Sequence, residues 1–121
     1  MNKPWQIELK AKYPELFPLR PKFNNPEELT NEPYCGFGCG EGWKDLLYAL
    51  CEELKPYKVS GVSQIKEKYA GLRFYVNAAE PEAYKIIAKY ETLSLTICET
   101  CGKPGSLREE GYYYTACDEH K

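Results

Sequence analysis

The spacing of hydrophobic residues changes along the chain, and each spacing predicts a different element. From residue 41 to residue 55 apolar side chains recur every three or four positions between charged ones, which is typical of an amphipathic helix that ends at Pro56. A second helix is predicted over 81–94, with Pro81 in its first turn. The apolar positions of the two helices are Trp43, Leu46, Leu47, Leu50, Cys51 and Leu54, then Ala83, Tyr84, Ile87, Tyr90 and Leu93.

Between these helices, hydrophobic and polar residues alternate from 63 to 69 and from 72 to 76. Alternation with a period of two predicts a β-hairpin, with its turn at Ala70-Gly71. The side chains expected to face the core are Ile65, Tyr69, Leu72, Phe74 and Val76. The side chains expected on the opposite, basic face are Gln64, Lys66, Lys68, Arg73 and Tyr75.

Both ends of the chain lack such long patterns. Prolines at 4, 14, 18, 21, 26 and 33 argue against long helices, so residues 1–33 are expected to run extended across the body. An arm that docks on a partner is the alternative. If the segment packs over the body, its large apolar side chains are expected to insert into the core. These are Trp5, Ile7, Leu9, Tyr13, Leu16, Phe17, Leu19 and Phe23. A glycine-rich loop is expected over 34–42, a short strand over 95–97, and two more over 106–108 and 112–115.

Together these elements predict a single α+β domain. Two helices would pack on a small antiparallel sheet, closed by a C-terminal zinc knuckle and β-hairpin. A chain of 121 residues is the right length for one compact domain. Its expected parts are the proline-rich segment 1–33, the helix-hairpin-helix body 34–94 and the zinc-binding tail 95–121. Without an apolar run of about 20 residues or a secretion signal at the start, we expect a cytoplasmic protein that does not enter a membrane.

The strongest chemical pattern is C-x2-C-x15-C-x2-H, formed by Cys98, Cys101, Cys117 and His120. Three thiolates and one imidazole at this spacing predict one tetrahedral zinc ion. Four protein ligands leave no position open for water, which favours a structural zinc over a catalytic one. The alternative is a terminal tail with free thiols. The site would use the only histidine of the chain, so no catalytic residue is predicted.

The other cysteines carry no comparable pattern. Without a secretion signal, reduced thiols fit the six cysteines better than a disulfide framework does. Cys35 and Cys39, near Cys51, could bind a second metal or could be incidental or buried thiols.

Two surfaces could bind a partner. The basic face combines three cations with an amide and a phenol, a set that contacts phosphates and stacks on bases. It could equally be the polar side of a sheet, where lysines discourage edge pairing. The net charge of −2 argues against bulk attraction of nucleic acid. Tyr112 to Tyr114, with Tyr34 and Trp43, could form a protein interface or pack the zinc hairpin on the body.

Three stretches of the chain carry a resemblance to a known group. Cys39-Gly-Glu-Gly-Trp43, the stretch from Val62 to Tyr75 (VSQIKEKYAGLRFY) and the Cys98–His120 pattern together resemble a largely uncharacterised group of small phage and prophage proteins. The resemblance implies an accessory phage product in the host bacterial cytoplasm that meets a host protein or counters a host defence. It supplies no reaction. It marks Gln64, Lys66, Glu67, Lys68, Leu72, Arg73, Phe74 and Tyr75 without giving them roles, and Cys35 lies outside it.

The closed metal site and the missing catalytic set predict a protein that binds without catalysis, and the resemblance implies that it binds and inhibits a host protein, such as a defence protein. It would bind through the 64–75 face or the aromatic surface near the tail. The alternative is a nucleic-acid or nucleotide-binding protein that uses Lys66, Lys68, Arg73 and Tyr75. An enzyme that uses Glu67 with Lys66 or Arg73 is the weakest hypothesis, because such ion pairs are commonly structural. No oligomeric state is predicted.

Overall fold

The computed structural model describes residues 3–121 and has the predicted α+β class. The described part contains the helices α1 (Pro4–Lys12), α2 (Lys44–Leu54) and α3 (Pro81–Leu93), with 3-10 turns η1 (Glu41–Trp43) and η2 (Ser94–Thr96). The strands are β1 (Arg20–Pro21), β2 (Leu29–Thr30), β3 (Phe37–Gly38), β4 (Val62–Lys68), β5 (Gly71–Val76), β6 (Ser106–Arg108) and β7 (Tyr114–Ala116). The two predicted helices and both predicted hairpins are confirmed, and α1 is an additional helix.

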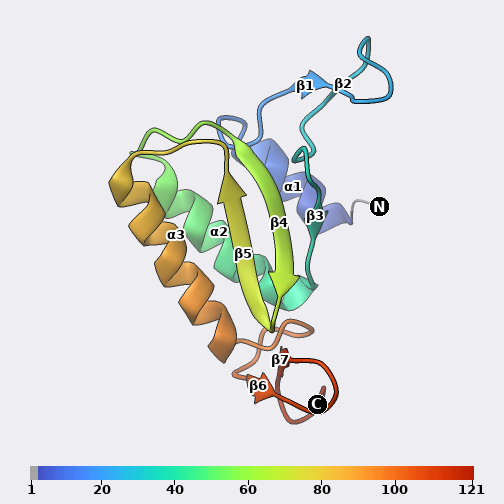
Figure 1. The fold of residues 1–121 in the computed structure, drawn as a ribbon, viewed down its shortest axis with the longest axis vertical. Helices are drawn as coiled ribbons and strands as arrows, with labels where there is room; N and C mark the ends of the chain where they lie inside the picture. The colour runs from blue at the N-terminus through green and yellow to red at the C-terminus, as the bar shows by residue number, and fades with distance from the viewer. Residues whose placement is uncertain (1–2) are drawn as a thin grey trace.

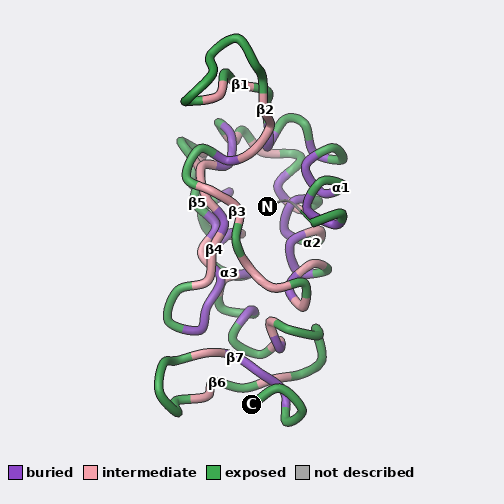
Figure 2. Tube along the Cα trace, turned by 90° about the vertical axis from the view of Figure 1, so that its right-hand side faces the viewer, coloured by how far each residue is buried: buried purple, intermediate pink, exposed green. Residues whose placement is uncertain are grey.

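The central sheet has the order β3-β4-β5 and one uncovered face. β4 pairs antiparallel with β5, and β3 pairs parallel with β4, so the sheet is mixed rather than purely antiparallel. Strand β3 comes from the glycine-rich segment that was expected to be only a loop. Figures 1 and 2 show the helices on one side of this sheet, which leaves the other side to solvent. We call this uncovered side the outer face.

The hydrophobic core fills the layer between the sheet and the helices (Figure 2). The predicted core positions of α2 are buried, as are Ile65, Leu72 and Phe74 of the hairpin, whereas Val76 is half-buried, because the helical and alternating patterns place these side chains on matching faces. The buried side chains of these two elements include Leu46, Leu47, Leu50, Leu54, Ile65, Leu72 and Phe74. Helix α3 buries Ala83, Ile87 and Tyr90, while Tyr84 and Leu93 are exposed.

The N-terminal segment differs from the extended course that was expected. Pro4 stands in the first turn of α1, where the missing N–H costs nothing, and the helix ends before Pro14. Trp5 and Leu9 of this helix are buried in the core, so the segment packs over the body as expected, although as a helix. Buried Lys10 forms an ion pair with Glu32, which ties the following segment to α1.

The ribbon β1–β2 projects away from the body at one end of the molecule (Figure 1). The expectation that Ile7, Leu19 and Phe23 insert into the core is wrong, because these side chains are 53%, 67% and 85% exposed. Phe23 lies near the end of the ribbon. Leu16 and Phe17, which precede the ribbon, are buried as expected.

The turn of the central hairpin lies one residue earlier than predicted. Lys68 pairs with Gly71, so Tyr69 and Ala70 form the turn. Tyr69, expected in the core, is therefore 71% exposed, because a turn residue does not follow the alternation of the strand. The register places Lys66 opposite Arg73 and Gln64 opposite Tyr75, as the predicted basic face requires.

Side chains from the α3–η2 segment cover the free edge of β5. The backbone N–H of Leu72 donates to Ser94 Oγ at 2.9 Å, and the N–H of Phe74 donates to Glu91 Oε2 at 2.9 Å. These contacts satisfy edge donors that could otherwise pair with another chain. The prediction of a short strand over 95–97 is wrong. The chain continues from α3 into η2, which places Ser94 at the edge of β5.

Candidate metal centre

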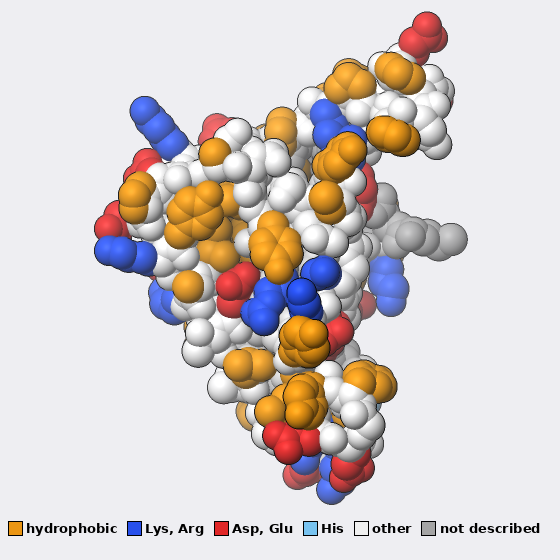
Figure 3. All heavy atoms as spheres, in the orientation of Figure 1, with side chains coloured by type: hydrophobic (Ala, Val, Ile, Leu, Met, Phe, Trp, Pro, Cys, Tyr) orange, Lys and Arg blue, Asp and Glu red, His pale blue; other side chains and the backbone are white. Residues whose placement is uncertain are grey.

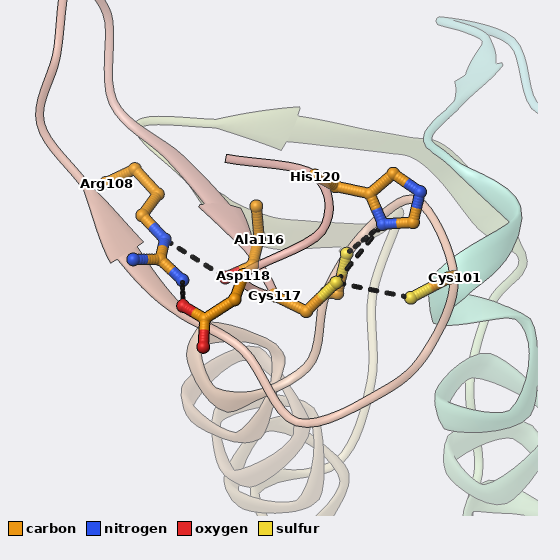
Figure 4. Close-up of polar contacts among 7 residues, drawn as sticks. Cys101, Arg108, Ala116, Cys117, Asp118 and His120 are labelled. Atoms are coloured by element: carbon orange, nitrogen blue, oxygen red, sulfur yellow. Dashed lines mark hydrogen bonds and ion pairs between the residues drawn. The ribbon is translucent and has the colours of Figure 1, made fainter.

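The four predicted ligands come together at the end of the molecule opposite the β1–β2 ribbon (Figure 1). Cys98 follows η2, Cys101 ends a tight turn, and Cys117 and His120 follow β7. The three sulfur atoms and the imidazole nitrogen all lie within 4.8 Å of one another. Figure 4 shows the imidazole of His120 and the side chain of Cys101 directed toward Cys117.

The Cys101–Cys117 and Cys98–His120 distances match those around a tetrahedral ion, whereas the Cys117–His120 distance is shorter. Zinc bonds of about 2.3 Å to sulfur and about 2.0–2.1 Å to nitrogen place neighbouring ligand atoms roughly 3.5–3.8 Å apart. Cys101 Sγ lies 3.6 Å from Cys117 Sγ, and His120 Nδ1 lies 3.7 Å from Cys98 Sγ and 3.1 Å from Cys117 Sγ. Three sulfurs and one imidazole nitrogen form a donor set typical of structural zinc.

The local electrostatics favour the thiolate form of Cys98. Burial raises the pKa of this thiol, but hydrogen bonds from the backbone N–H groups of Cys117, Cys101 and Thr100 outweigh burial and lower its pKa to about 6. The hydrogen bond with Cys117 raises the pKa of His120. A thiolate is the form that binds a metal, so the backbone around Cys98 prepares the site for a cation.

Residues outside the cluster hold the Cys117 segment in place. Arg108 on β6 donates from Nε to the carbonyl of Ala116 at 3.2 Å and from its guanidinium to Asp118 Oδ1 at 3.1 Å (Figure 4). The pairing of β6 with β7 places Ser106 beside Ala116. Arg108 therefore orients both neighbours of Cys117, in the manner of residues that support metal ligands in proteins.

The glycine-rich segment before α2 is the docking site of the metal cluster. Gly42 N–H donates to the carbonyl of Glu99 at 2.7 Å, and Gly40 N–H donates to Glu99 Oε2 at 2.8 Å. Trp43 Nε1 donates to the carbonyl of Ile97 at 2.9 Å. A Cβ on Gly42 would lie 2.1 Å from the Cys98 carbonyl oxygen, so this approach requires glycine. The sequence pattern showed the glycines but not what they contact.

The remaining cysteines lie outside the cluster. Cys35 is exposed, Cys39 is half-buried and Cys51 is buried in the core. Burial raises the pKa of both Cys39 and Cys51 to about 12, which keeps these thiols protonated. Within residues 3–121, the 98–120 cluster is the one group of metal-binding side chains close enough to share an ion, so the idea of a second metal finds no support there.

The predicted basic side chains lie together on the outer face of the sheet. Figure 3 shows Lys and Arg side chains gathered over β4 and β5, with hydrophobic side chains above and below them and an acidic side chain beside them. Lys66 and Arg73 are direct cross-strand neighbours and Lys68 is at the end of β4. Within residues 3–121 none of these three cations forms an ion pair. On this face β3 contributes only Gly38 beside Lys66.

Glu67 is separated from these cations. The alternation along β4 directs it to the opposite side from Lys66, and its Oε2 accepts a hydrogen bond from the N–H of Ala70 at 2.8 Å. It lines a hollow of about 470 Å³ that also contacts Glu99 and His120. The arrangement thus does not pair Glu67 with Lys66 or Arg73.

The expected aromatic surface is smaller than the sequence suggested. Trp43 is fully buried in the core and cannot contact a partner. Tyr112 and Tyr113 are exposed on the C-terminal hairpin, whereas Tyr114 packs against the buried part of the cluster. Tyr34 is also exposed, but its ring lies beside Arg20 of the β1–β2 ribbon, 5.4 Å from the guanidinium carbon.

A search of protein-family models, of curated proteins and of solved structures finds no match to this chain. Within the described residues, no helix has the length and apolar character needed to cross a membrane. The fold and the cluster define a small α+β protein with a Cys3His group at one end. The further conclusions rest on the geometry of this group and of the outer face.

Proposed function

We propose that the protein is a zinc-stabilised binding protein without catalytic activity, and that it binds a host protein through the outer face of its sheet. The resemblance to phage proteins suggests that it is a phage accessory product in the bacterial cytoplasm and that binding inhibits a host defence protein. Lys66, Arg73 and Tyr75 would form the centre of the contact, with Gln64 and Lys68 beside them.

The metal cluster supports a structural role for zinc. Cys98, Cys101, Cys117 and His120 supply four ligands, so a bound ion would have no position for a water or substrate. Bound zinc would connect the segment after η2 with the segment after β7. The ion would then stabilise the tail, and the only imidazole of the chain would be a ligand rather than an acid or base.

The observation that carries the binding proposal is the cation pair on the outer face. Lys66 and Arg73 lie directly opposite each other, an arrangement of like charges that destabilises a sheet. No carboxylate within residues 3–121 forms an ion pair with either of them. An acidic surface on a partner would remove this repulsion and would hydrogen-bond the planar guanidinium of Arg73.

Charge substitution on two parts of the surface tests this proposal. Lys66→Ala with Arg73→Ala removes two charges from the outer face, while Lys85→Ala with Lys103→Ala removes two exposed charges elsewhere. We expect affinity capture from bacterial lysate to recover the same protein with the wild type and the control, but not with the outer-face variant. Recovery that is equal with both variants, or no partner at all, would contradict the proposal.

A nucleic acid is the second candidate, because the Gln64–Tyr75 pair lies next to the Lys66–Arg73 pair. Tyr75 is 40% exposed and could stack on a base while the cations contact phosphates. If Lys66, Lys68 and Arg73 each contact one phosphate of a single strand, log K should fall with log salt at a slope of about −2. Titration of labelled oligonucleotides at several salt concentrations measures this slope, and absence of binding removes this candidate.

A further inference from the structure

The turn of the β4–β5 hairpin has an unfavourable backbone conformation. Tyr69 has φ 51° and Ala70 has φ 75°, and neither residue is glycine. Two-residue hairpin turns of this kind favour asparagine and glycine, because other side chains crowd the backbone in the left-handed region. Ala70 is also fully buried although it is a turn residue. Contacts from outside the hairpin must therefore stabilise this turn.

These contacts come from the segments that carry the metal ligands. The carbonyl of Ala70 accepts a hydrogen bond from Thr115 Oγ1 at 2.8 Å, and Thr115 is buried on β7, two residues before Cys117. The carbonyl of Thr115 accepts from the N–H of Glu99 at 3.2 Å, beside Cys98. Thr115 thus lies between the turn and both halves of the cluster.

A second contact reaches the other side of the same turn. Ser94 Oγ accepts a hydrogen bond from the N–H of Leu72 at 2.9 Å. Ser94 begins η2, which leads directly to Cys98. The turn residues 69–70 and the first part of β5 are therefore supported from β7 and from η2, the two segments that an ion in the cluster would join.

We propose that metal occupancy of the cluster controls the shape of the binding surface on the outer face. With the ion bound, Thr115 holds Ala70, and the turn keeps Lys66, Lys68 and Arg73 in register. Without it, β7 separates from the turn, the turn relaxes, and the cations lose their fixed arrangement. This inference rests on the proposed binding function, but the coupling between cluster and turn can be measured without any ligand.

Thr115 offers a matched pair of variants for the measurement. Thr115→Val keeps the branched shape and removes the hydroxyl donor, whereas Thr115→Ser keeps the donor. Neither variant changes a metal ligand, so zinc content should remain stoichiometric in both. We would follow amide hydrogen exchange residue by residue in the full chain by NMR, for the wild type with zinc, the wild type after chelation, and both variants with zinc.

We expect the amides of residues 68–73 to exchange at least about tenfold faster in zinc-loaded Thr115→Val and in the chelated wild type, a change that corresponds to about 1.4 kcal/mol. Thr115→Ser should exchange like the wild type, and residues 47–54 of α2 should not change in the zinc-loaded variants. Unchanged exchange at 68–73 in zinc-loaded Thr115→Val would overturn the inference. This result remains decisive if chelation unfolds the whole chain.

The link to binding is tested separately with two probes, poly-L-glutamate and single-stranded oligothymidylate. Coupling between two binding equilibria is reciprocal, so a probe that binds the outer face should also raise the affinity of the chain for zinc, measured by equilibrium competition with a chelator. Binding that is weaker in zinc-loaded Thr115→Val than in Thr115→Ser supports the inference, and equal binding contradicts it. If neither probe binds, the proposed function fails for these ligand classes, while the exchange data still decide whether the cluster braces the turn.

Discussion

The contact between the glycine-rich segment and the metal cluster allows a sharp test of the fold. Gly42→Ala adds a Cβ that would lie 2.1 Å from the carbonyl oxygen of Cys98 and 2.5 Å from the carbonyl carbon of Glu99. Both atoms belong to the backbone, so neither can move aside as a flexible side chain would. The cluster must therefore shift away from the body.

The size of the effect follows from the bonds that such a shift breaks. Three hydrogen bonds join the glycine segment to the cluster, from Gly42 and Gly40 to Glu99 and from Trp43 to Ile97. At about 1 kcal/mol each they contribute about 3 kcal/mol, and crowding beside buried Trp43 adds about 1–2 kcal/mol. We expect a loss of roughly 4–5 kcal/mol in the free energy of unfolding, or roughly 15–20 °C in Tm.

Urea unfolding of the zinc-loaded protein, followed by circular dichroism, measures this loss. Gly38→Ala is the matched control, because a Cβ at Gly38 meets nothing within 4 Å. The control should change stability by less than about 0.5 kcal/mol. Zinc content should stay the same in both variants, since all four ligands lie between Cys98 and His120. Equal stability of the two variants would refute the docking role of the glycine segment.

Three further predictions concern the metal, the N-terminal segment and high pH. Elemental analysis should find one zinc per chain, and none after Cys98→Ser with Cys101→Ser, which should also remove exchange protection from 95–121. Lys10→Met should lower the free energy of unfolding in urea by about 3 kcal/mol, because it leaves the Glu32 carboxylate without its ion-pair partner. Adding Glu32→Leu to Lys10→Met should restore most of this free energy. A hydrogen bond to a carboxylate on α2, together with burial, raises the pKa of Tyr90 from 10.0 to about 12, which favours the protonated phenol in the folded state. The stabilisation of the folded state by the Tyr90 phenol is therefore complete below pH 10 and is lost as the pH rises toward 12. The difference in the free energy of unfolding between wild type and Tyr90→Phe should shrink over that range.

Local patterns were sufficient for the elements that bury one face. The three-to-four spacing from Leu46 to Leu54 and the alternation from Ile65 to Phe74 predicted α2 and the β4–β5 hairpin, because these periods match the geometry of helix and strand. The turn was misplaced by one residue because Ala70-Gly71 looked the better turn, whereas Tyr69 and Ala70 form it with support from Thr115. The residues next to Ala70 in the sequence do not indicate its hydrogen bond with Thr115, which lies 45 residues further along the chain.

The sequence by itself determined the ligand set of the candidate metal centre and the composition of the basic face. The spacing between Cys98 and His120 is a local property, and the strand period places Lys66 and Arg73 on one side. Only the tertiary structure decided that β3 joins the sheet, that Gly42 contacts the cluster and that Thr115 hydrogen-bonds the hairpin turn. These contacts join segments distant in the chain, and they form where close packing and backbone hydrogen bonding are satisfied together.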